Sequence, residues 1–141
     1  WPFYGAWRPS IMASILKVDD LRGNTAAGNI TITSEGGSAT MQLQQGVAKA
    51  WATVNGSSGT PSLTFSLNCS SNVDNGVGNY HTNLTNAMSS TQYPVTTNDN
   101  ERGCGESVQN AASAVVTVIR NPTNLATVDA SSFFTLFGDL A

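Results

Sequence analysis

Short runs of apolar residues, most of them alternating with polar ones, fill the chain from residue 47 onward, and turn-forming residues separate the runs. Alternation with a period of two predicts a half-buried β-strand, because successive side chains of a strand point to opposite faces. The runs include residues 47–56, 63–67, 80–84, 91–97, 114–119 and 132–137. None has sustained helical periodicity. We therefore predict an all-β fold in which residues 47–141 form an antiparallel, jelly-roll-like β-sandwich knob.

Turn-forming residues divide these predicted strands. Asn55-Gly56 ends the first run, and residues 74–78 (Asp-Asn-Gly-Val-Gly) have the composition of a hairpin turn. Pro94 lies inside a predicted strand, and proline cannot donate to a hydrogen-bond ladder. The strand that contains Pro94 is therefore expected at a sheet edge or a bulge.

The large aromatic residues are expected in the core. Burying a ring such as that of Trp51 contributes roughly 2–3 kcal/mol, and the same argument applies to Tyr80 and Tyr93. The alternative is that these rings form a surface that stacks against carbohydrate. The apolar residues within 63–67 alternate with polar ones and are expected to share one half-buried side of their strand.

Residues 12–46 differ from the rest of the chain. Residues 15–21 are a short apolar segment, residues 30–33 predict a short strand, and residues 39–45 fit either a strand or a helical turn. These residues hold too few apolar side chains for a core of their own. They are expected to pack on the knob, on a sister chain or on another protein. We therefore divide the chain into an extended N-terminal attachment and assembly segment, residues 1–46, and the knob, residues 47–141.

The first eleven residues are rich in aromatic residues and proline but lack the basic start and apolar centre of a signal peptide. Met12-Ala13-Ser14 would make an ordinary start. Residues 1–11 are therefore either upstream sequence, added by an extended reading frame, or a short docking peptide.

The amino-acid composition favours some classes of protein over others. Charged residues make up 11% of the chain, against about 25% in typical globular proteins. A surface of Ser, Thr, Asn, Gln and Gly is more typical of extracellular, fibre and virion proteins than of cytosolic enzymes. The net charge is -3, with no cluster of Lys or Arg, so nucleic-acid binding is not expected. No run of 18 apolar residues exists, so membrane insertion is not expected.

Catalytic and metal chemistry find little support in the sequence. His81 is the one histidine, and a general base would also need an orienting carboxylate and a nucleophile. We expect His81 to face outward into solvent. Cys69 and Cys104 are either two unrelated thiols or one bridge, and their spacing does not fit structural zinc. The protein is expected to be no enzyme and to need no cofactor or metal.

The acidic residues are expected in solvated loops rather than in a glycosidase pair or a calcium site. A binding surface, if the knob has one, should lie on loops that the sandwich carries. The candidates are the turn at residues 57–61 and the polar loop at residues 98–107. The individual residues are Ser57, Ser58, Asn98, Asp99, Asn100, Glu101 and Arg102.

Four spaced motifs carry a resemblance to a known module. They are residues 46–56 with Ala-Lys-Ala-Trp and Asn-Gly, residues 66–80 with Asp-Asn-Gly-Val-Gly-Asn-Tyr, residues 83–88 (Asn-Leu-Thr-Asn-Ala-Met) and residues 93–95 (Tyr-Pro-Val). In this order they resemble a module of structural proteins in tailed bacteriophages. The opening at residues 12–23 resembles the start of such proteins. Cys69 and Leu84 depart from the usual pattern, which has an apolar residue and often Phe at these places.

The resemblance implies a non-enzymatic virion protein. Such modules typically form the C-terminal part of tail-fibre or appendage proteins, notably in phages of cyanobacteria and other marine bacteria, and these proteins are commonly trimers. We expect a homotrimer with residues 12–46 about the three-fold axis, assembled in the host cytoplasm and exposed on the virion. Residues 1–46 would bind other virion proteins, and the knob would face a host glycan or protein. The alternatives are a capsid or neck decoration protein and a carbohydrate-binding module.

Overall fold

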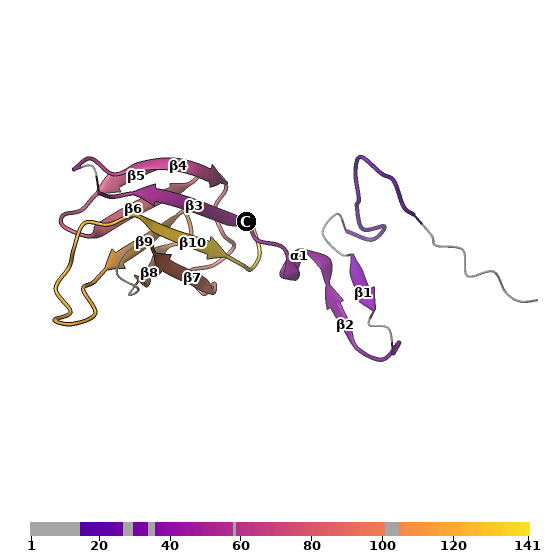
Figure 1. The fold of residues 1–141 in the computed structure, drawn as a ribbon. Helices are drawn as coiled ribbons and strands as arrows, with labels where there is room; N and C mark the ends of the chain where they lie inside the picture. The colour runs from indigo at the N-terminus through magenta and orange to yellow at the C-terminus, as the bar shows by residue number, and fades with distance from the viewer. Residues whose placement is uncertain (1–14, 27–29, 34–35, 58, 101–104) are drawn as a thin grey trace, which may run out of the picture.

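The computed structural model describes residues 15–26, 30–33, 36–57, 59–100 and 105–141 (Figure 1). The predictions for residues 1–11 fall outside this part of the chain. The elements are β1 (Thr31–Thr33), β2 (Thr40–Gln42), α1 (Leu43–Gly46), β3 (Ala50–Asn55), β4 (Ser62–Leu67), β5 (Cys69–Asp74), β6 (Asn79–Leu84), β7 (Val95–Asp99), β8 (Gly105–Ala111), β9 (Ala114–Ile119) and β10 (Ser132–Leu136).

Two antiparallel four-stranded sheets form the knob, with strand orders β4-β3-β10-β7 and β5-β6-β9-β8. The sheets are packed together (Figure 1), which confirms the predicted all-β sandwich. β9 supplies the most buried strand, since all of Ala114–Ile119 is buried. Pro94 directly precedes β7, which is an edge strand of its sheet, as the missing donor of proline requires.

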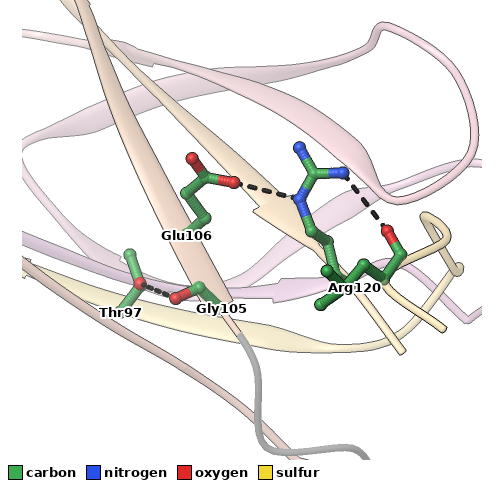
Figure 2. Close-up of polar contacts among 5 residues, drawn as sticks. Thr97, Gly105, Glu106 and Arg120 are labelled. Carbon is green, nitrogen blue, oxygen red and sulfur yellow. Dashed lines mark hydrogen bonds and ion pairs between the residues drawn. The ribbon is translucent and has the colours of Figure 1, made fainter. Parts of the chain in front are cut away.

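Two connections join the sheets at their edges. Asn68 alone links β4 to β5, in the left-handed conformation with φ 56° that asparagine tolerates. Its amide accepts from Asn86 N at 2.7 Å and donates to the Asn86 carbonyl at 3.1 Å. At the opposite edge, Thr97 Oγ1 of β7 donates to the Gly105 carbonyl of β8 at 3.0 Å (Figure 2). The sandwich is therefore closed on both sides by specific polar contacts.

The core confirms two of the three aromatic predictions. Tyr80 and Tyr93 are buried, whereas Trp51 is 38% exposed, so the prediction that Trp51 lies in the core was wrong. On β3 the small residues Ala50 and Ala52 point inward. Because neighbours on a strand point to opposite faces, Trp51 between them must point outward.

A β-bulge corrects the prediction for residues 63–67. Thr53 of β3 pairs with Phe65, but the next residue, Val54, pairs with Leu63, so the register shifts by one residue. Such a bulge turns the residues beyond it to the other face. Leu63 packs against the core, whereas Phe65 and Leu67 are 69% and 47% exposed.

A close contact between Gly56 and Tyr80 links the two sheets. A Cβ atom on Gly56 would lie 2.0 Å from the Tyr80 hydroxyl oxygen. That hydroxyl accepts a hydrogen bond from Ala130 N at 3.2 Å and donates to Asp129 Oδ1 at 3.3 Å. Asp129 Oδ1 also accepts from Gly78 N at 2.7 Å. The Tyr80 hydroxyl therefore connects the end of β3, the turn before β6 and the loop before β10.

The segment before the knob forms little core of its own. β1 and β2 pair as a two-stranded ribbon, and α1 follows directly, so residues 39–45 contain both a strand and a helical turn. Figure 1 shows this ribbon apart from the sandwich. Gln45 Nε2 donates to Asp139 Oδ1 at 2.6 Å, and Lys49 N donates to the Leu136 carbonyl at 2.8 Å. The Gln45 contact ties the end of the segment to the knob, and the Lys49 contact fixes the first residues of the knob beside β10.

Replacing Gly56 by alanine should destabilise the knob by about 3 kcal/mol, because the new Cβ overlaps the Tyr80 hydroxyl and its hydrogen bonds. Urea unfolding followed by circular dichroism measures the change. Gly36→Ala is the control, since no atom lies within 4 Å of its Cβ position. Equal stability of the two variants would contradict the proposed role of the contact.

Candidate functional site

The predicted loops leave the sheet that contains β3 at the same end. Val54 of β3, Ser132 of β10 and Asp99 of β7 lie in one row across the strands. Ser57 follows β3, and Asn100 follows β7, so both loops leave the sheet at this end. Ser57, Asn98 and Asn100 are exposed. Ser58, Glu101 and Arg102 lie outside the described residues.

Asp99 corrects the prediction for this loop. Its side chain is buried, opposite Ser132 on the inner face of the sheet. A buried carboxylate is not available to a ligand at the surface. Asp99 is therefore a structural residue and not part of a binding surface.

The outer face of the same sheet carries large apolar side chains that the sequence pattern did not predict at the surface. One row across the strands is Leu67, Trp51, Thr135 and Thr96. The next row is Phe65, Thr53, Phe133 and Asn98. We call Trp51, Phe65, Leu67 and Phe133 the aromatic face. The alternation around Ala50 and Ala52 could have identified Trp51, but the bulge that exposes Phe65 and Leu67 has no clear sequence signal.

A shallow hollow borders the aromatic face between β10 and β7. Its volume is about 160 Å³, and it is lined by Thr96, Thr97, Asn98, Phe133, Phe134 and Thr135. Pockets for drug-sized ligands are usually larger, about 300–1,000 Å³. The hollow offers hydroxyl and amide groups beside Phe133 and Phe134 and would hold at most a small group of a partner.

The outer face of the other sheet holds His81. In its row, His81 lies between Val73 of β5 and Val116 of β9. The side chain is half-buried rather than fully solvated, and Nε2 has no hydrogen-bond partner among the described residues. Apolar neighbours on both sides provide neither a nucleophile nor an orienting carboxylate for acid–base chemistry.

Glu106 and Arg120 of the knob form an exposed ion pair. Arg120 Nε lies 3.0 Å from Glu106 Oε2, and Arg120 Nη1 donates to the Leu125 carbonyl at 3.3 Å (Figure 2). An exposed pair of this kind contributes at most about 1 kcal/mol. Within the residues that the structure describes, no group of three or more His, Cys, Asp or Glu side chains could hold a metal ion. In the same part of the chain, no helix is long and apolar enough to span a membrane.

Cys69 carries a free thiol at the start of β5. Burial raises its pKa to about 11, and its Sγ lies 3.3 Å from the Leu67 carbonyl, which it can donate to. A thiol that stays protonated is a weak nucleophile. Cys104 lies outside the described residues.

Burial raises the pKa of Tyr80, and the negative charge of Asp129 raises this pKa further.

Comparison of the chain with protein-family models, with curated proteins and with solved structures gave no match. The resemblance to a phage module therefore stays a prediction.

The Cys69 thiol should be alkylated at least about tenfold more slowly in the folded protein than in the urea-unfolded chain at pH 8, because the thiolate is the reactive form. Mass spectrometry of a Cys104→Ser variant isolates the Cys69 reaction. Folding raises this pKa from 9.0 to about 11. The contribution of the neutral thiol to stability is therefore complete below pH 9 and is lost between pH 9 and pH 11. Equal alkylation rates in the two states would contradict this.

Proposed function

We propose that the chain is a non-enzymatic structural subunit of a tailed-phage virion, in a tail fibre or appendage. Residues 1–46 attach it to other virion proteins, and the knob is exposed for host attachment. It assembles in the host cytoplasm and acts on the particle outside the cell. The observation that carries the proposal is the apolar surface that residues 15–26, 30–33 and 36–46 leave uncovered within a single chain.

The uncovered apolar surface lies on residues 15–21 and on the ribbon formed by β1 and β2. Ile15 and Leu16 are 78% and 75% exposed, and Val18 and Leu21 are also exposed. On the ribbon, Ile32 and Met41 are exposed. Exposed apolar side chains gathered in one segment are typical of an interaction site. This supports a segment that is stable only in an assembly.

An apolar hollow on the ribbon supports the same proposal. It has a volume of about 280 Å³ and is lined by Ile32, Ala39, Thr40 and Met41. The apolar segment at residues 15–21 precedes it in the chain and would suit it as an occupant from a neighbouring copy. We propose a homotrimer, the state implied by the resemblance, in which residues 12–46 of the three chains cover one another about the three-fold axis.

A carbohydrate-binding module is the second candidate. The exposed ring of Trp51, beside the hydroxyl group of Thr135, favours it. Such a module would bind glycans as a monomer and would need no attachment segment.

A capsid or neck decoration protein is distinguished from a fibre subunit by its location on the particle. Immunogold labelling of virions reports this location.

The full chain should have three times the mass of one chain in light scattering coupled to size exclusion. The double variant Ile15→Ser/Leu16→Ser should shift toward monomer, because it removes apolar surface that the assembly would bury. Each replaced side chain should cost about 1–2 kcal/mol of association free energy per chain.

Lys17→Ser is the matched control for this experiment. Lys17 lies next to Leu16 in the same exposed segment, so its replacement changes the segment without removing an apolar side chain. The control should stay trimeric. A wild-type chain that is monomeric would contradict the proposal and would favour the carbohydrate-binding module.

A further inference from the structure

The aromatic face exposes more apolar surface than scattered single residues would. Phe65 is 69% exposed and Leu67 is 47% exposed, and Trp51 and Phe133 are exposed beside them at 38% and 39%. The strand pairing brings these four side chains into two neighbouring rows of one sheet. A contiguous apolar patch of this kind marks an interaction site more often than a free surface.

The position of the face relates it to the attachment segment. Trp51 is the second residue of β3, and it pairs with Leu67 at the end of β4. Two residues before Trp51, Lys49 donates from Nζ to the Gln44 carbonyl of α1. The aromatic face therefore begins where the attachment segment ends, and Figure 1 shows α1 beside the start of β3. Copies held together by their segments would bring this end of each knob close to the common axis.

The charge pattern fits a partner that is identical to the chain itself. Close to a rotation axis each residue lies near its own symmetry copies, so a charged residue there would lie near the same charge. None of the residues in the two rows is charged. The Glu106–Arg120 pair, by contrast, lies on the other sheet (Figure 2). Thr and Asn at the β7 side of the rows would form the polar rim that interfaces have around an apolar centre.

We infer that the aromatic face of each knob packs against the knob of a neighbouring copy of this chain. The knobs then contribute to the assembly interface, in addition to residues 12–46. This inference rests on the self-assembly in the proposed function and adds to it the surface that the knob uses. A glycan is the less favoured occupant of the aromatic face. Phe65 is the most exposed side chain of the face, and neither Phe65 nor Leu67 can form a hydrogen bond with a sugar hydroxyl group.

A matched pair of variants in the full chain tests the inference. Leu67 on the aromatic face and Val73 on the opposite sheet are almost equally exposed, at 47% and 46%. Sedimentation equilibrium measures self-association. Leu67→Asp should weaken it at least about tenfold, because it removes an apolar contact and places like charges together at the axis. Val73→Asp should leave it within about twofold.

A photo-crosslinking arm decides the question if Leu67→Asp does not fold. Phe65 is replaced by the photoreactive analogue p-benzoylphenylalanine, and the same analogue at Val73 is the control. Covalent oligomers after irradiation should form from position 65 and not from position 73. Oligomers that form equally from both positions, or from neither, would overturn the inference.

The outcomes separate this inference from the proposed function. A wild-type chain that is monomeric overturns both. An assembled wild-type chain in which Leu67→Asp associates as tightly as Val73→Asp, with no cross-link from position 65, overturns the inference alone. That result would leave the aromatic face open to a glycan, and binding of a neutral polysaccharide that Trp51→Ala abolishes would establish this.

Discussion

The knob depends on one buried contact, in which the backbone of Gly56 lies directly against the hydroxyl of Tyr80. The contact leaves no room for a side chain at residue 56. The hydroxyl has both a donor and an acceptor partner, because it accepts from Ala130 N and donates to Asp129. One side chain of β6 thus fixes the end of β3 in the opposite sheet and the loop that leads into β10. A buried polar group stabilises a fold only when such partners are present.

The same packing produces the surface that we assign to assembly. Tyr80 is one of the buried side chains between the sheets, and the inward residues of β3 are small or medium-sized, namely Ala50, Ala52 and Val54. Trp51 is then forced to the outer face by the strand period. The bulge in β4 adds Phe65 and Leu67 to this face. The core and the proposed interface are therefore two sides of one sheet.

The sequence predicted those features that depend on local pattern. The alternating runs predicted the sandwich, and Pro94 predicted an edge strand, because both follow from the backbone chemistry of a strand. Tyr80 was placed in the core correctly. Trp51 was not, because ring size was weighed above the alternation of its small neighbours. For the candidate site, Asn98 is exposed, but it lies in β7 and not in the predicted loop at residues 98–107.

Other features depend on pairing between distant strands, which one sequence does not reveal. The exposure of Phe65 follows from a register shift against β3, and the burial of Asp99 follows from its pairing with Ser132. Both require knowledge of the partner strand. The aromatic face could not be predicted for the same reason, since it combines residues from β3, β4 and β10.

Hydrogen–deuterium exchange of the full chain at several protein concentrations tests the central claim most directly. That claim is that the knob is folded by its own contacts, whereas the proposed assembly covers the apolar side chains of the attachment segment. The account predicts that β3, β6 and β9 are protected at every concentration and that residues 15–46 become protected only when the chain assembles. Protection of residues 15–46 in a monomeric chain, or loss of protection in β6 on dilution, would contradict it.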